Sequence, residues 1–180
     1  MIFRTILHLL RSRRASKLGV HDVSRVKMRV VPTDLDVLGH MNNGVYFSIM
    51  DLGRLDLMVR AGLWPLLRAR GYYPVMANAS MTFRKSLQPW QVFWLETRIV
   101  GYDAKAVYAE QRFVVDGEIY AQGMARARFL KKSGGTVSMA ELSELTGVDV
   151  SAYPPPAWVA DWVANVTLPP TRDPAPSTWS

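Results

Sequence analysis

One apolar segment near the middle of the chain limits what the chain can fold into. Residues 43–61 are apolar on most sides of a helical wheel, with polar positions scattered rather than gathered: Ser48, Asp51, Arg54, Asp56 and Arg60. A helix of this kind has no single solvent face, so other structure must wrap it. We therefore expect a long central helix over residues 43–61, followed by one or two turns over residues 63–70 and a stop at Gly71.

Strand patterns flank this helix. Residues 25–31 alternate apolar and basic side chains and end at Pro32, the pattern of a half-buried strand. Four more segments of period two follow the helix, at residues 75–85, 92–102, 106–115 and 118–131. Turn signals at Pro89, at residues 101–103 and at residues 116–117 separate them at hairpin spacing, which predicts that consecutive strands are antiparallel neighbours.

The last strand segment indicates how the helix and the sheet meet. One of its faces carries only small residues: Ala121, Gly123, Ala125 and Ala127. Such a face lets a helix lie close against the strand. The fold class is therefore α+β, with an antiparallel sheet curled around one long helix.

Composition divides the chain into four regions. Residues 1–24 form a basic amphipathic arm, and residues 25–132 form the globular domain. Residues 133–150 hold a short helix whose capping box begins at Ser138. Residues 151–180 contain seven of the 11 prolines and are expected to behave as a tail, with one or two helical turns around Trp158 and Trp162.

The net charge of +7 belongs to the arm. Of the 22 Lys and Arg and 15 Asp and Glu residues, seven basic and one acidic lie in residues 1–27, which leaves the rest nearly balanced. The charge therefore does not indicate a nucleic-acid-binding face. Three interpretations of the arm stay open: a helix packed on the domain or on a partner subunit, a peripheral contact of residues 1–20 with an anionic membrane, or a cleaved targeting segment. Arg4 and His8 interrupt its apolar run, which disfavours a secretory signal and favours a cytoplasmic location.

Several kinds of chemistry are excluded by what the sequence lacks. There is no Cys, so disulfides, thiolate metal sites and Cys nucleophiles are excluded. The three imidazoles, His8, His21 and His40, lack ligand-like spacing, so no metal site is predicted. The chain also lacks the serine-hydrolase elbow and the glycine-rich nucleotide motifs, so no cofactor is expected.

Residues 34–46 remain as the segment that carries chemistry. Asp34 and Asp36 lie in a loop that turns through Gly39 into Asn42 and Asn43, which open the long helix. A carboxylate can accept a proton or attack a carbonyl, and the unpaired N–H groups of a first helical turn can hold an oxyanion. These are the two halves of an acyl-transfer site.

The same residues carry a resemblance to a known family. The segment resembles the signature of the 4-hydroxybenzoyl-CoA thioesterase family of hotdog-fold proteins, which is matched at Asp34, Asp36, Gly39, His40, Asn42, Asn43 and Tyr46. The sequence of residues 34–43 looks most like that of the subgroup known as thioesterase superfamily member six. The resemblance implies a hotdog fold over about residues 25–132 and hydrolysis of acyl-CoA or acyl-carrier thioesters.

The resemblance also implies roles for individual residues. Asp36 would act as general base or nucleophile, and the backbone N–H near Asn43 would polarise the thioester carbonyl. His40 would orient the loop or contact the substrate, while Asn42 and Tyr46 would lie beside the substrate. The alternative for Asp36 is an Asx turn that only holds the loop.

For the CoA moiety, such proteins use basic side chains at the sheet rim. Arg84 and Lys85 are the leading candidates here, with further basic residues available at Arg126, Arg128, Lys131 and Lys132. Asn78, on the polar phase of its strand, is expected to face the site across a subunit boundary. The family relation implies a homodimer paired edge to edge, with two sites at its interface.

Two other functions stay open. One is a non-catalytic acyl-CoA-binding or membrane-associated protein that keeps the hotdog pocket. The other is a dehydratase or hydratase, which requires a His paired with an acid; His40 beside Asp36 partly satisfies that requirement.

Overall fold

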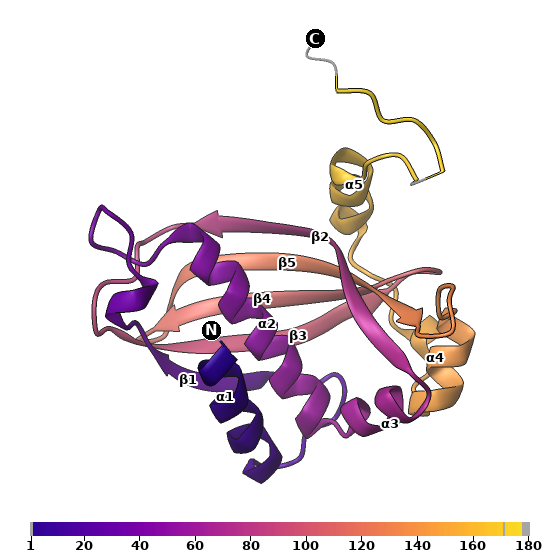
Figure 1. The fold of residues 1–180 in the computed structure, drawn as a ribbon, viewed down its shortest axis with the longest axis horizontal. Coiled ribbons are helices and arrows are strands. Elements are labelled where there is room, and N and C mark those ends of the chain that lie inside the picture. Colours follow the sequence, from indigo (N-terminus) through magenta and orange to yellow (C-terminus); the bar gives the residue numbers. More distant parts are fainter. Residues whose placement is uncertain (1, 171, 178–180) are drawn as a thin grey trace.

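The computed structural model describes residues 2–170 and 172–177 of the chain (Figure 1). In chain order its elements are α1 (Ile2–Arg14), β1 (Ser24–Arg29), the 3-10 turn η1 (Pro32–Asp34), α2 (Asn43–Arg60), α3 (Leu63–Ala69), β2 (Tyr72–Phe83), β3 (Val92–Tyr102), β4 (Val107–Val115), β5 (Glu118–Lys131), α4 (Met139–Thr146), η2 (Val150–Ala152) and α5 (Ala157–Val166). The predicted central helix and the five predicted strands are confirmed.

The sheet is antiparallel throughout, but its strand order differs from the expected meander. The order is β1-β3-β4-β5-β2, so β3, β4 and β5 pair as consecutive hairpins while β2 pairs with β5. The prediction that residues 75–85 and 92–102 are neighbours was wrong. The connection between them passes beneath the start of α2, where Leu87 is fully buried and its carbonyl accepts the Met41 N–H at 2.9 Å.

Helix α2 lies in the concave face of the sheet (Figure 1). A methyl group added at Gly53 would come within 2.5 Å of Thr97 Oγ1, and one added at Gly123 within 2.6 Å of Met50 Cε. The small residues of β5 therefore do allow the close approach that their pattern predicts. The buried side chains between α2 and the sheet form the main core.

Two further helices cover this two-layer unit. Helix α1 packs against α2, next to the edge strand β1 (Figure 1). Helix α5, longer than the one or two turns expected around Trp158 and Trp162, packs on the convex face of the sheet, where Val159 is buried against Tyr108 and Met124. Among the described residues, no helix combines the length and apolar character needed to cross a bilayer.

Candidate active site

The loop from residue 34 to residue 42 is a tight hairpin that ends at the start of α2. The Asp36 N–H donates to the His40 carbonyl at 3.0 Å, and the Gly39 N–H donates to the Asp36 carbonyl at 3.1 Å. Gly39 adopts a φ of 77°, a left-handed conformation that glycine tolerates without strain. At the tip, Val37 and Leu38 are exposed.

Asp34 anchors the base of this loop. Its carboxylate is buried, accepts two hydrogen bonds of 2.9 Å from Arg4 Nη1, and accepts the Val31 N–H at 3.0 Å. Its backbone carbonyl accepts the Asn42 N–H at 2.8 Å. Both carboxylate oxygens of Asp34 therefore already accept hydrogen bonds from the protein itself.

Asp36 has a different environment, because one of its oxygens stays available. Its Oδ1 accepts the Leu38 N–H at 2.9 Å, which is an Asx turn. Its Oδ2 lies 3.4 Å from His40 Nδ1, and both side chains are partly exposed. That His40 nitrogen makes no hydrogen bond within the described part of the chain. The structure thus brings the predicted acid and imidazole together.

The start of α2 lies directly after this loop. Asn42 is the N-cap, and its Oδ1 accepts the Gly44 N–H at 2.8 Å. The Asn43 N–H, one position earlier in the turn, meets no acceptor in the part of the chain that the structure describes. A free N–H at a helix N-terminus is a ready donor to a developing oxyanion.

Tyr46 lies one turn further along α2 and is buried. Its hydroxyl oxygen accepts the Leu87 N–H at 3.1 Å, and its ring packs edge-on against Phe83 and Phe113. Burial raises the pKa of the Tyr46 phenol. The observed contacts of Tyr46 tie the connection after β2 to the helix start.

The three other residues predicted to contact the substrate lie in two different parts of the structure. Arg84 and Lys85 follow β2 at the rim, where both are exposed and paired with Glu118 at 2.7 and 2.6 Å. Asn78 lies on the convex face, where its Nδ2 donates to the Val166 carbonyl at 2.9 Å and its Oδ1 accepts from Arg126 at 3.3 Å. In the single chain, Asn78 therefore lies on the face opposite α2.

A cavity of about 270 Å³ lies between the second half of α2, α3, α4 and the concave face of the sheet. Its walls are almost entirely apolar and include Leu57, Leu67, Ile99, Ala125, Phe129 and Leu142. The sequence patterns did not predict this cavity. The one signal was the small face of β5, since Ala125 and Ala127 leave the space open.

A polar group borders the cavity at the middle of α2. Arg54 bonds Asp51 one turn earlier and donates to Gln111 Oε1 at 2.5 Å. Burial lowers the pKa of the Arg54 guanidinium, and Asp51 opposes this effect. Gln111 in turn donates to the Met50 carbonyl and to Thr97 Oγ1, both at 2.9 Å. These side chains were also missed, because their partners are distant in sequence.

Comparison with known proteins assigns the family. A family model described as the thioesterase-like superfamily matches residues 30–163, which include the loop, helix α2 and every strand of the sheet except β1. The chain belongs to the thioesterase-like superfamily. The predicted resemblance to hotdog thioesterases is thereby confirmed.

Individual curated proteins are similar to this chain over part of their length. Protein THEM6 of Xenopus laevis is 37% identical over 99 residues, which is 55% of this chain and 48% of that protein. A probable thioesterase of Saccharomyces cerevisiae is 27% identical over 104 residues, 57% of this chain and 45% of that protein. The chain thus spans about half the length of these curated relatives.

Solved structures of other proteins share the fold. The YbaW probable thioesterase of Escherichia coli superposes with a TM-score of 0.63 at 18% identity, covering 67% of this chain and 94% of that one. The DHNA-CoA thioesterase of Staphylococcus aureus gives a TM-score of 0.62 at 13% identity, covering 79% and 93%. The predicted hotdog fold is confirmed by these matches.

Proposed function

We propose that this protein hydrolyses acyl-CoA or acyl-carrier thioesters, with Asp36 and the Asn43 N–H at the reacting carbonyl. One observation carries the proposal: a carboxylate with an available oxygen lies in a hairpin that leads directly into a helix whose first N–H is free. A base and an oxyanion donor are what hydrolysis of an already activated thioester requires.

In the proposed reaction, the thioester carbonyl oxygen accepts the Asn43 N–H. Asp36 takes a proton from water, and the resulting hydroxide adds to the carbonyl carbon. The negative charge on the carbonyl oxygen is stabilised by that N–H and by the positive end of the α2 dipole. The C–S bond then breaks, and the leaving thiolate takes up the proton. If Asp36 instead attacks directly, the acyl-aspartate anhydride is hydrolysed in a second step.

We propose that the apolar cavity holds the acyl group. Its volume is at the small end of ligand sites, which suits an acyl portion rather than a whole CoA molecule. Within one chain, however, the loop lies at the start of α2, whereas the cavity is lined by α2 residues from Asp51 onward. The helix rises about 12 Å from residue 43 to residue 51 and about 20 Å from residue 43 to residue 57. A reacting carbonyl at the loop is therefore distant from the same chain's cavity.

A homodimer paired through β2 removes this difficulty. Strand β2 is an open edge with exposed Tyr73, Met76 and Phe83. Its end, at Phe83, packs on Tyr46 beside the start of α2, whereas Met76 near its beginning lines the cavity. Two copies of β2 paired antiparallel place the end of one strand beside the beginning of the other. Each proposed site thus combines the loop of one subunit with the cavity of its partner.

The test is thiol release from a panel of acyl-CoA substrates with saturated chains of increasing length and with benzoyl-CoA. Asp36→Asn should lower kcat by about 10²-fold or more without changing the melting temperature. Asp161→Asn, an equally conservative change at an exposed carboxylate on α5, is the matched control. Full activity in Asp36→Asn would refute the assigned role.

The composite site has its own test. Asp36→Asn and the cavity-filling Ala127→Leu should each be inactive alone, yet a refolded mixture should recover activity, because mixed dimers contain one intact site. No recovery from two folded, dimeric variants would refute a site shared between subunits.

The 3.4 Å approach of Asp36 and His40 also favours a second candidate, a hydratase acting on enoyl-CoA. Hydration of an enoyl-CoA without thiol release would support it. Tight binding of acyl-CoA with neither reaction would instead identify a non-catalytic acyl-CoA-binding protein.

A further inference from the structure

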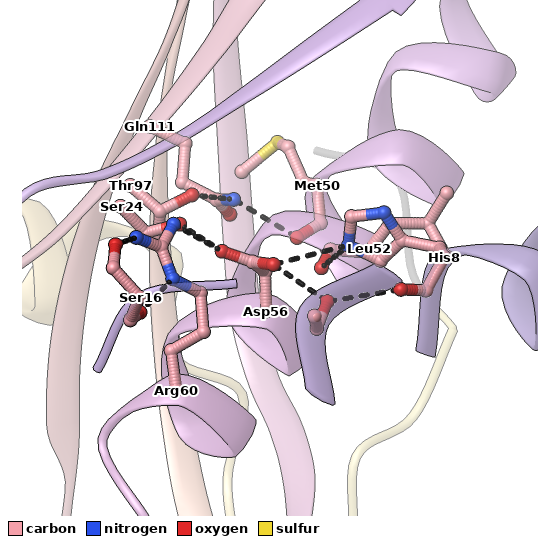
Figure 2. A network of polar contacts seen from close by, with 10 residues as sticks. His8, Ser16, Ser24, Met50, Leu52, Asp56, Arg60, Thr97 and Gln111 are labelled. Carbon is pink, nitrogen blue, oxygen red and sulfur yellow. Dashed lines mark hydrogen bonds and ion pairs between the residues drawn. The ribbon is translucent and has the colours of Figure 1, made fainter. Parts of the chain in front are cut away.

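Helix α1 is attached to the domain through its polar residues. Of the α1 side chains that the structure describes, His8 and Ser12 are the most buried, 6% and 2% exposed. His8 Nε2 lies 2.9 Å from the Leu52 carbonyl, and Ser12 Oγ donates to Asp56 at 2.6 Å. Figure 2 shows this network, in which Asp56 also accepts from Ser24 at 2.5 Å and from Arg60 at 3.2 Å. The rotation of α1 about its axis is therefore fixed by specific hydrogen bonds.

This orientation leaves the apolar side of α1 in solvent. Ile6, Leu7 and Leu10 are 53%, 40% and 48% exposed. Positions 6 and 10 are one helical turn apart and lie roughly opposite positions 8 and 12 on a helix of 3.6 residues per turn. An amphipathic helix of a globular protein normally buries its apolar stripe. An exposed apolar stripe rimmed by charge is typical of an interaction surface.

The charge around this stripe is positive. Arg11, Arg13 and Arg14 lie in the last turn, and the first acidic residue of the chain is Asp22. A groove of about 520 Å³ between α1 and β1 adds basic side chains beside Leu7: Arg4, Arg11, Arg25, Lys27, Arg29 and Arg60. Three of them are already paired with carboxylates: Arg4 with Asp34, Arg25 with Glu96 and Arg60 with Asp56. Within the described part of the chain, Arg11, Lys27 and Arg29 form no ion pair and keep their charge available.

These positive charges favour an anionic bilayer over a second copy of this chain as the binding partner of the outward side of α1. A second copy of α1 packed on this surface would bring like charges together with no acidic residue from either helix, which opposes association. An anionic bilayer instead offers headgroup phosphates to the arginines and acyl chains to Ile6, Leu7 and Leu10. A helix of 13 residues lying flat in the interface satisfies both demands.

We infer that the outward side of α1, together with the basic groove beside it, is a docking surface for an anionic lipid bilayer. The polar network around Asp56 holds the helix with its apolar stripe outward, so the surface is preformed. The inference is independent of the proposed hydrolysis, because it uses none of the site residues.

Sedimentation of the full chain with vesicles tests the inference. Vesicles of phosphatidylcholine mixed with phosphatidylglycerol should bind the protein at low ionic strength, and added salt should weaken this binding. The fraction bound to vesicles of phosphatidylcholine alone should be lower by about tenfold or more. Leu10→Glu should abolish binding, whereas Leu168→Glu, at an exposed apolar position outside α1, should not.

Charge reversal supplies the second pair of variants. Arg13→Glu with Arg14→Glu should reduce binding at least about tenfold, whereas Arg68→Glu with Arg70→Glu, which changes the net charge equally on an exposed part of the surface, should leave most of it. Melting curves show that each variant is folded.

Three outcomes would overturn the inference. The first is equal binding to neutral and anionic vesicles, or to neither. The second is a smaller assembly in light scattering for Leu10→Glu with no vesicle binding by the unsubstituted protein, which would make the stripe a contact between copies. The third is binding of free glycerol phosphate without binding of vesicles.

Discussion

At the scale of the residue, Asp34 and Asp36 show how two carboxylates two positions apart acquire different capacities. Asp34 is buried and fully bonded to Arg4 and to the backbone, so it has no oxygen left for a substrate. Asp36 is partly exposed and keeps one oxygen beside His40. The loop sequence could identify both residues as candidates, but only the position of Arg4, 30 residues earlier, distinguishes them.

Tyr46→Phe tests a second residue of the signature. The change removes the acceptor of the Leu87 N–H, and an unpaired buried N–H costs about 1–3 kcal/mol. We expect a lower free energy of unfolding in urea denaturation and an unchanged KM. A raised KM with unchanged stability would mean that the Tyr46 hydroxyl contacts the substrate instead.

Gly53→Ala tests the closest approach of α2 to the sheet. The added methyl group would lie 2.5 Å from Thr97 Oγ1 and 2.6 Å from Leu95 Cδ2, so α2 must shift. Overpacking of this kind costs about 1–3 kcal/mol. Ser48→Ala, at a half-buried position of the same helix where no methyl group is added against the sheet, is the control and should change the melting temperature little.

At the scale of the element, local patterns located the helices and strands, but not every pairing between them. The spacing after residue 83 looks like a hairpin, but the chain instead passes under Tyr46, where Leu87 is buried, and crosses to β3, the neighbour of the edge strand β1. Likewise, the arm sequence predicts an amphipathic helix. Its rotation depends on Asp56, which lies 44 residues after Ser12 and outside any local pattern. The cavity also depends on contacts between distant parts of the chain, because its walls come from segments far apart in the sequence.

The attachment of α1 should depend on pH through His8. Burial lowers the pKa of His8 below its ordinary value of 6.5, while Asp56 and the hydrogen bond to the Leu52 carbonyl oppose that shift and Arg11 and Arg4 add to it. A lowered folded pKa means that the unfolded chain binds the proton more tightly. The contribution of neutral His8 to the free energy of unfolding is therefore fully present above pH 6.5. It is lost as the pH falls from there toward the pKa of His8 in the folded protein.

Thermal unfolding measured across this range provides the check. Stability should fall with acidification by at most about 1.4 kcal/mol per pH unit for this one proton. His8→Gln, which keeps a donor for the Leu52 carbonyl, should flatten the dependence. Because burial also lowers the pKa of His21, His21→Gln is the comparison, and the double variant should be the flattest. An unchanged slope in His8→Gln would contradict the prediction.

At the scale of the whole molecule, the layers leave one sheet edge beside the proposed site open. Met76 is exposed at that edge, and Met76→Lys would place a charge where two copies of β2 are proposed to meet. We expect a monomer in light scattering, with activity lost in parallel. Trp90→Lys, an exposed apolar residue away from β2, should remain dimeric and active. An active monomer would show that one chain contains a complete site.

The strand order also has a consequence for the order in which the molecule folds. The hairpins β3–β4 and β4–β5 connect neighbours in the chain, whereas β2 must find β5 across β3 and β4. Contacts between distant segments form late, since their loop closure costs entropy that local hairpins avoid. By the same reasoning β1 also joins late, because it pairs with β3 across a longer stretch of chain. Strand β2 is bonded on one side only, so it should open before the central strands. Its amides should exchange with solvent sooner than those of β4 in the isolated chain, and binding of a second subunit should slow that exchange. Assembly would thus complete the folding of this edge.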